Sequence, residues 1–378
     1  MNINKIVKSI LRYRWIIISV VILFTAFSGY QITKMQINSD VISSLPDDDP
    51  DAALLKQIAD HFGSNKMGMV ILENDNIFQT EVLEHVKQVS DTIGQIVGVM
   101  SVTSLTNIID INEFGIGTLV DPYDMPDTEE ELQQLRERVF AKEMYKGSIV
   151  SEDGTATLII FSLTEEADVE MVAKTVINKT EAMDLPETIY YAGSPMMVTA
   201  ISDLISSDLF LLLPIAFLVI AIILALFFKT VRGVFLPLIT VAIAITWTLG
   251  LMALFGYKMS MISNNMPIIL LAVGSAYTIH VLNRINQMRD TDRRKVLLRA
   301  LAYIFIPLIL SAVTTAIGFM SFIFGAYLEM IREFGIFTSL GTLFAAVLSL
   351  FFTPSLIAGF SIYNKKLADK KNSYKYSW

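Results

Sequence analysis

Long apolar runs separated by short polar segments dominate the pattern of this chain. A membrane-spanning helix needs about 20 mostly apolar residues. Six stretches are of this kind: residues 15–31, 209–228, 234–255, 266–281, 300–323 and 334–360. The fourth is the shortest and the most polar. The pattern predicts an α-helical membrane protein with six transmembrane helices, one near the N-terminus and five after residue 206.

The segment between the first two runs has the periodicity of a soluble domain. Strands are predicted at residues 67–73, 97–104, 155–162 and 187–191, and helices at 80–93 and 168–183. The order β-α-β-β-α-β is that of the ferredoxin-like (split βαβ) α+β arrangement. An insertion between the second and third strands contains a helix that starts at Thr128, because Thr128 and Glu131 have the spacing of a capping box.

The distribution of Lys and Arg predicts the orientation of the helices. Basic residues gather before the first run, at 229–232, at 284–299 and at 365–375, whereas Lys258 and Arg332 are single in the loops of the other side. Cytoplasmic loops carry an excess of Lys and Arg. We therefore predict a multi-pass protein of the cell inner (cytoplasmic) membrane with both termini in the cytoplasm.

Four parts of the chain follow from this topology. Residues 1–33 form the cytoplasmic N-terminus and the first transmembrane helix, and residues 34–206 form an external (periplasmic) domain. Residues 207–363 contain five transmembrane helices, and residues 364–378 form a basic cytoplasmic tail. The basic start of the first segment, its apolar run and the Ala26-Phe27-Ser28 within that run also resemble a cleavable signal peptide. In both interpretations the large domain is exported.

Composition narrows the function classes. The chain is 53% hydrophobic and 17% charged and has no cysteine, which excludes disulfides and thiolate metal sites. Its three histidines are far apart, and it has no phosphate-binding P-loop motif. We predict no catalytic residue, metal or cofactor, and therefore not an enzyme.

The external segment is strongly acidic, with 31 Asp and Glu against 10 Lys and Arg between residues 34 and 206. This charge would attract a cationic partner, or it serves solubility alone. It argues against nucleic-acid binding.

Several local strings resemble the resistance-nodulation-division (RND) superfamily. They are Leu45-Pro46-Asp47-Asp48-Asp49-Pro50, Gly193-Ser194-Pro195, Gly274-Ser275-Ala276-Tyr277-Thr278-Ile279-His280 with Asn283-Arg284, and Thr314-Thr315-Ala316-Ile317-Gly318-Phe319. Together with the one-plus-five topology they resemble one half of a hydrophobe/amphiphile exporter or of an MMPL-like lipid exporter. The resemblance implies efflux of hydrophobic or amphiphilic substrates, such as lipids or lipid-linked molecules, from the inner membrane outward. It also implies contact with membrane lipids, a homodimer or a heterodimer with a similar half, and a periplasmic carrier protein as a further partner.

The chain departs from the pattern of proton-driven relatives at Ala276, where those relatives have an acidic residue in the fourth helix. Tyr277, His280 and Arg284 are spaced to share one helix face, which we expect to point into the bundle. Histidine titrates near neutral pH, so Tyr277 and His280 are either a proton relay or a structural hydrogen-bonded pair. Further transport or relay candidates that would join them follow: Ser275, Thr314 and Thr315.

Two other functions fit the same fold. A lipid-binding receptor or scaffold would need no proton carrier, which agrees with the missing carboxylate. A protein-translocation auxiliary belongs to the same superfamily, although its fourth-helix strings are not evident here.

Overall fold

The structure is a computed structural model that describes residues 3–38, 44–46, 48–62, 66–112, 115–121, 124–288, 290 and 292–360. The chain divides into two compact units. We call Asp47–Asp203 the sheet unit. The described residues up to Pro46 and from Leu204 onward form the helical unit. The predicted tail at 364–378 lies outside the described residues.

Six helical segments of the described chain are long and apolar enough to cross a membrane, which confirms the predicted number of spans. The first five are α2 (Arg14–Ile32), α7 (Ser194–Phe228), α8 (Val231–Leu254), α9 (Met266–Gln287) and α10 (Arg293–Met320). The sixth begins as α12 (Glu329–Val347), passes through the π-helical turn η4 (Leu348–Phe352) and ends as α13 (Thr353–Gly359). Short elements complete the unit: α1 (Ile3–Arg12), η3 (Ser263–Asn265), α11 (Phe322–Gly325) and a parallel pairing of β1 (Ile37–Asn38) with β8 (Met259–Ser260).

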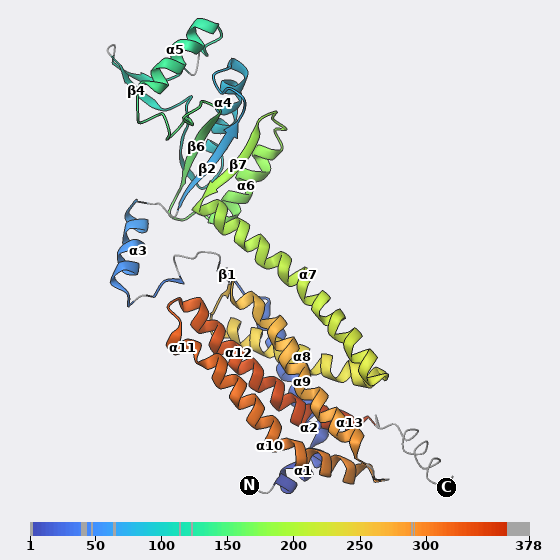
Figure 1. Cartoon of the computed structure of the whole chain (residues 1–378). Coiled ribbons are helices and arrows are strands. Elements are labelled where there is room, and N and C mark those ends of the chain that lie inside the picture. Colours follow the sequence, from blue (N-terminus) through green and yellow to red (C-terminus); the bar gives the residue numbers. More distant parts are fainter. Residues whose placement is uncertain are drawn as a thin grey trace. The chain divides into compact units, whose positions relative to one another are not determined.

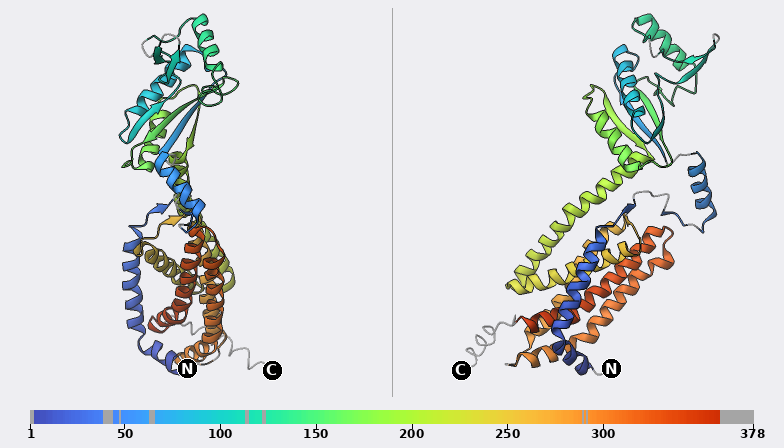
Figure 2. Two further views of the ribbon diagram at one scale, coloured as in Figure 1. Left: turned by 90° about the vertical axis from the view of Figure 1, so that its left-hand side faces the viewer. Right: turned by 180° about the vertical axis from the view of Figure 1, so that it is seen from behind.

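The long helices of the helical unit other than α7 pack into a bundle in which α9 and α12 contact each other and both α8 and α10, and α2 lies against α8 (Figures 1 and 2). Small residues allow close approach between membrane helices. A side chain at Gly250 of α8 would meet the backbone oxygen of Ser28 in α2 at 2.6 Å, so only glycine fits there. The membrane part of α7 differs, because only 6% of its most apolar window is buried in the chain.

The sheet unit is built on four antiparallel strands in the order β3-β6-β2-β7. They are β2 (Met67–Glu73), β3 (Val99–Thr103), β6 (Ala156–Leu163) and β7 (Thr188–Gly193). Helices α4 (Thr80–Gly94) and α6 (Val169–Glu181) pack on one face of this sheet and share a core with it, in which Val70, Val86, Phe161 and Val176 are fully buried (Figure 1). The strands and helices lie where the periodicity predicts them.

The inserted segment packs around a second core, which it shares with the start of α4. It contains the antiparallel pair β4 (Ile109–Asn112) and β5 (Gly115–Thr118) and the helix α5 (Glu129–Phe140). The capping box is present, since the Thr128 side chain accepts from the Glu131 backbone N–H and the Glu131 side chain accepts from that of Thr128. The sequence patterns did not predict the pair β4–β5 or the helix α3 (Pro50–Phe62).

The last strand of the sheet continues directly into α7. Gly193 ends β7 with φ +89°, and a Cβ there would lie 2.4 Å from the Met67 carbonyl oxygen. Glycine is the residue that adopts this left-handed conformation without strain. The helix then runs 35 residues from Ser194, so it starts 15 residues before the predicted span.

Candidate functional site

The predicted polar face of α9 does not form a single inward-facing site. Tyr277 is buried, with 4% of its surface exposed, whereas His280 is exposed on the outside of the bundle. The Tyr277 hydroxyl has no hydrogen-bond partner, so the predicted Tyr277–His280 pair is not formed. The expectation that the whole face points inward is wrong, because one turn of helix between i and i+3 leaves about 60° between the two side chains and the bundle covers only one of them.

Arg284 lies at the end of the same helix and stacks on an aromatic ring. Its guanidinium carbon is 3.6 Å from the centre of the Tyr303 ring in α10, and its Nη1 donates to Gln287 Oε1 at 3.1 Å. Its Nε is buried without a partner. A cation over an aromatic face is attracted by the ring quadrupole. Arg284 therefore links the C-terminal end of α9 to the N-terminal part of α10.

The remaining candidate hydroxyls mainly bind their own helices. Ser275 donates to Ala272 O at 3.1 Å, and Thr314 and Thr315 both donate to Ser311 O at 2.9 Å. Thr314 is exposed, whereas Thr315 interacts electrostatically with the Tyr277 hydroxyl without a hydrogen bond of normal geometry. The structure thus brings together Tyr277 and Thr315, but neither His280 nor Thr314 joins them.

A different polar group occupies the interior of the helical unit. Thr278 of α9 and Ser349 of η4 are 2.8 Å apart, and Thr240 of α8 and Thr353 of α13 are 3.0 Å apart. All four side chains are fully buried. We call them the hydroxyl cluster. Sequence reasoning missed it, although Ser349 and Thr353 at i and i+4 in an apolar run were a visible signal.

The hydroxyl cluster is satisfied by the helices around it. Ser349 donates to Ala345 O and Thr240 donates to Leu236 O, each at 2.7 Å, so Thr278 donates to Ser349 and Thr353 donates to Thr240. The π-helical turn of the sixth span lies at this point, and such turns are frequent at functional sites. The cluster is neutral and offers hydrogen bonds between three spans without the desolvation cost of a charge.

Carboxylates of the helical unit stay near the ends of spans. The sixth span begins at Glu329, five residues before the predicted run, so Glu329 and the half-buried Glu333 lie within its first turns. Asn264 Nδ2 donates to Asp208 of α7 at 3.5 Å, and its buried Oδ1 has no partner.

The sheet unit buries charged groups in pairs. Asp110, 2% exposed, accepts hydrogen bonds from Lys142 Nζ and from the Tyr145 hydroxyl, the latter at 2.8 Å. Burial alone would raise the pKa of Asp110, but the bonds from Lys142 and Tyr145 outweigh it and lower the pKa below its usual value. Burial and the neighbouring Asp110 raise the pKa of Tyr145 to about 12. These groups fix the inserted segment.

Two further polar contacts hold the helices of the sheet unit. His85 Nδ1 lies 2.9 Å from a carboxylate oxygen of Glu187, whose side chain is fully buried. Lys174 of α6 lies 2.8 Å from Glu170 and 2.9 Å from Asp203, which belongs to the first turns of α7. The described residues contain no group of three or more His, Asp and Glu side chains that could hold a metal ion.

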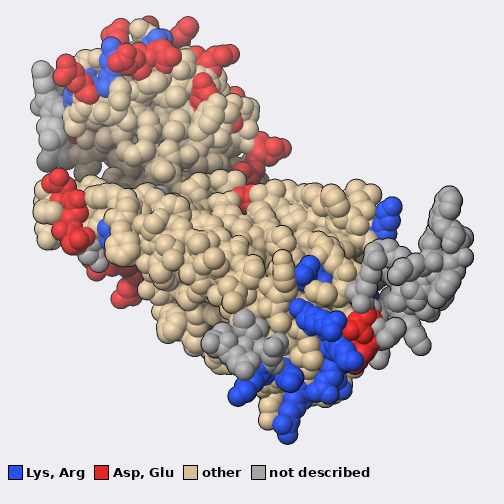
Figure 3. All heavy atoms as spheres, turned by 60° about the horizontal axis from the view of Figure 1, so that its bottom comes forward, with Lys and Arg blue, Asp and Glu red and all other residues tan. Residues whose placement is uncertain are grey.

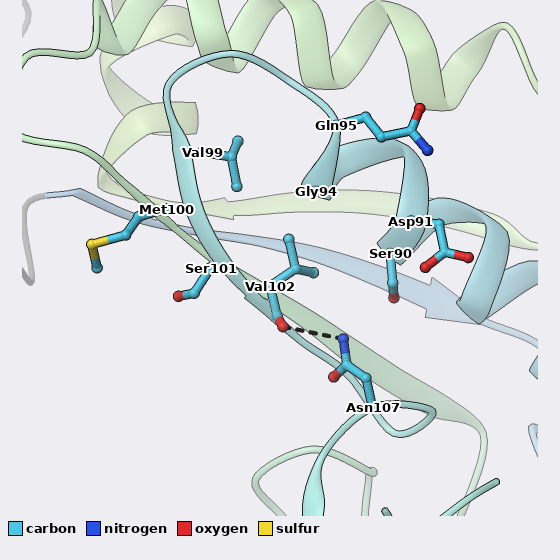
Figure 4. A pocket seen from close by; sticks show the side chains of 9 residues that line it. All are labelled: Ser90, Asp91, Gly94, Gln95, Val99, Met100, Ser101, Val102 and Asn107. Carbon is cyan, nitrogen blue, oxygen red and sulfur yellow. Dashed lines mark hydrogen bonds between the residues drawn. The ribbon is translucent and has the colours of Figure 1, made fainter. Parts of the chain in front are cut away.

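An open groove of about 400 Å³ runs between the C-terminal end of α4 and the edge strand β3 (Figure 4). Polar side chains line much of it: Ser90, Asp91, Gln95, Ser101 and Asn107. Asn107 Nδ2 donates to the Val102 carbonyl oxygen at 3.1 Å, while Met100 points away from α4 (Figure 4). The groove has one carboxylate and no histidine, so it offers recognition of a polar or cationic group and no acid–base chemistry.

The two units carry charged side chains mainly of different sign. Lys and Arg gather at one end of the helical unit, and Asp and Glu are scattered over the sheet unit (Figure 3). The basic end includes residues of α1, of the α7–α8 turn and of the start of α10.

Comparisons with known proteins identify a family for this chain. The family model of the MMPL family matches residues 44–378, which include the sheet unit and the five later spans. A membrane protein of Methanocaldococcus jannaschii is 23% identical over 360 residues, which are 91% of this chain and 90% of the relative.

Proposed function

Because this chain belongs to the MMPL family, we propose that it is a half-size RND-type transporter that moves hydrophobic or amphiphilic molecules, such as lipids or lipid-linked molecules, outward from the membrane. In this proposal two copies, or this chain and a similar half, form the working assembly. The sheet unit is its ferredoxin-like porter domain on the outer side, where a periplasmic carrier protein would receive the substrate.

The observation that carries the proposal is α7. This helix leaves the sheet at Gly193 and continues without a break through 35 residues into an apolar segment of which only 6% is buried. A helix hydrophobic all round and uncovered by its own chain must contact lipid or another apolar molecule. The helix that continues from the sheet unit into the helical unit is therefore also the span whose apolar window is least buried in the chain.

The basic end of the helical unit supports an orientation in the inner membrane with both termini in the cytoplasm (Figure 3). The chain has no cysteine, so single cysteines report sidedness. We expect Glu152→Cys, on an exposed turn of the sheet unit, to react with an impermeant maleimide on spheroplasts, and Lys371→Cys to react only after lysis. The opposite result would refute the orientation.

The transport test uses the purified full-length protein in liposomes that contain a fluorescent phospholipid. Dithionite destroys only the fluorophores in the accessible leaflet. We expect protein-dependent movement of lipid between leaflets, and cysteine labelling identifies the direction. Light scattering in nanodiscs measures the number of copies, and an active monomer would contradict the dimer.

A lipid-binding receptor is the second candidate, and one observation favours it. The buried core of the helical unit is closed by neutral hydroxyls, and the acidic side chains described in its spans lie at their ends. An intramembrane carboxylate is a frequent proton carrier. Lipid that co-purifies with the protein, together with no protein-dependent movement under any imposed proton or sodium gradient, would decide for the receptor.

A further inference from the structure

We propose that the turn between α7 and α8 is a binding site for an anionic phospholipid, with the phosphate at Lys229 and an acyl chain along the apolar wall beside it. The inference rests on the proposed function for the kind of molecule, and it adds a place in the fold and a headgroup charge.

The site is an open pocket of about 400 Å³ in the helical unit. Its lining is apolar apart from one cation and one hydroxyl: Ala225, Lys229, Thr230, Val231, Val234 and Phe235. Ligand pockets of this kind combine hydrophobic walls with a few polar groups that fix the orientation of the ligand. A pocket with apolar walls and a single ammonium group suits a ligand that has an apolar chain and a negatively charged headgroup.

Lys229 occupies a backbone position that favours glycine. Its φ is +50°, and it is one of two non-glycine residues with positive φ in the described chain. This left-handed conformation is unfavourable for a residue with a Cβ. A turn that needed only to reverse the chain would be more stable with glycine, so the lysine side chain has a use of its own here.

The ammonium group of Lys229 is available to a ligand. It forms no ion pair with a carboxylate among the described residues, and the residue is exposed. Phe228, which is not among the residues that line the pocket, packs against Gly233, where a Cβ would lie 2.3 Å from Phe228 Cβ. The base of the hairpin is thus closed, and the pocket stays open beside Lys229.

The apolar side of the pocket is open to the surroundings of the helical unit and is not covered by the protein core. Phe227 and Val231 are 82% and 83% exposed, and Phe235 is 61% exposed. A lysine at the end of a span extends its ammonium group toward the headgroups while its methylene chain stays in apolar surroundings. A bound phospholipid would lie the same way, with its phosphate oxygens at the ammonium group and its acyl chain along Phe235 and Val234.

A cation in this loop has a second explanation, because it would help to set the orientation of the helices in the membrane even without binding a lipid. The positive-inside rule counts charges in a loop, and Arg232 supplies a second one. Topology therefore needs neither a lysine at a left-handed position nor a pocket next to it. Variants that separate the two roles can be made.

The test measures lipid binding to the full-length protein in detergent by native mass spectrometry, with phosphatidylglycerol and phosphatidylcholine of identical chains as probes. Lys229→Gly removes the charge and suits the backbone, so its thermal stability should equal or exceed that of the parent. We expect it to lose about fivefold in phosphatidylglycerol affinity and nothing in phosphatidylcholine affinity. Lys258→Gly, which removes an exposed lysine from another loop, is the matched control and should bind as the parent does.

Filling the pocket gives an independent arm. Ala225→Trp keeps Lys229 and should weaken the binding of both lipids. Unchanged phosphatidylglycerol binding in Lys229→Gly, or an equal loss in Lys258→Gly, would overturn the site. Competition by free glycerol phosphate at millimolar concentration would overturn the assignment to a lipid.

The binding assay is separate from the transport assay, so the two proposals fail in different ways. Lys229-dependent binding without lipid movement in liposomes refutes transport alone. Lipid movement without Lys229-dependent binding refutes this site alone.

Discussion

The sheet unit and the helical unit both bury polar side chains, but the groups that they bury differ in kind. In the sheet unit the buried polar groups include carboxylates with a nitrogen partner: Asp110 pairs with Lys142, and Glu187 lies against the His85 ring. In the helical unit the buried polar groups are mainly neutral hydroxyls. The hydrogen-bonded pair of Thr278 and Ser349 is an example. The same chain therefore uses two ways to connect its elements.

The difference follows from the surroundings of each unit. An ion pair in a water-exposed domain can keep one partner near solvent, as Lys142 does with 37% of its side chain exposed. A charge inside a bilayer costs several kcal/mol, whereas a hydroxyl pair costs little and still links two helices. Contacts in the helical unit therefore depend on close backbone approach and shape, and contacts in the sheet unit depend partly on charge.

The largest expected effect comes from breaking close approach in the helical unit. Gly250→Val would place side-chain atoms on the backbone of Ser28, which cannot move aside. Overpacking of this kind costs about 3 kcal/mol or more. We expect little monodisperse protein after extraction, measured by size-exclusion chromatography after heating.

Gly318→Val in α10 is the matched control, because nothing lies within 4 Å of the position of its Cβ. It should elute as the parent does. If both variants lost the same amount of monodisperse protein, a valine in α10 would be as harmful as one in α8. Close packing of α2 on α8 would then not explain the loss in Gly250→Val.

The second effect concerns the charged core of the sheet unit. Asp110→Asn removes the charge that Lys142 and Tyr145 bind, and it should cost about 1–3 kcal/mol. We expect faster hydrogen exchange in peptides that contain Tyr145, measured on the full-length protein in nanodiscs. Asp124→Asn in the same inserted segment is the control, since Asp124 is exposed.

The pH dependence of this effect has a definite sign. The pKa of Asp110 is lowered in the folded protein relative to about 3.9 in the unfolded chain. Its contribution is therefore complete above the unfolded pKa and disappears as the pH falls through the folded value. The parent and Asp110→Asn should differ at pH 7 and converge below pH 4. A constant difference at all pH values would contradict the assignment.

Periodicity was enough to predict most of the elements. β2 has the predicted bounds, and α4 and β6 lie within one residue of theirs, because each alternation continues without interruption from turn to turn. Hydropathy also identified six spans. It missed the first 15 residues of α7, since they are more polar than the apolar run that follows, and the first ten of them belong to the sheet unit.

The candidate site was harder to predict, for a physical reason. Helical spacing groups Tyr277 with His280, but the bundle covers only the side of α9 that carries Tyr277 and Thr278. Which side is covered depends on the neighbours α8, α10 and α12, and one sequence does not give their packing. The hydroxyl cluster was overlooked because threonine in a membrane helix often binds its own backbone.

The third effect tests the neutral contacts directly. Thr278→Val removes the hydroxyl bonded to Ser349 and keeps the shape of the side chain. Hydrogen bonds between membrane helices contribute about 0.6 kcal/mol on average and up to about 1.7 kcal/mol. A double-mutant cycle with Ser349→Ala should give a coupling of this size in thermal unfolding. Thr246→Val, whose hydroxyl binds only Ala242 O of its own helix, should show no coupling to Ser349→Ala.

The smallest effect is expected where the sheet unit's charges are most exposed. Lys174 binds Glu170 and Asp203, but 42% of its side chain and 60% of that of Asp203 are exposed to solvent. Such pairs contribute at most about 1 kcal/mol and are weakened by salt. Lys174→Met should therefore change the unfolding midpoint only slightly, and Lys179→Met, an exposed lysine on the same helix, should not change it.

The bond to Glu170 and then that to Asp203 raise the pKa of Lys174. The contribution is thus present below the unfolded pKa of about 10.4 and is lost as the pH rises through the folded value. If Lys174→Met instead cost as much as Asp110→Asn, and cost it equally at high salt, burial would not be what separates strong from weak charge pairs in this unit. The contrast between the two units would then need another physical cause.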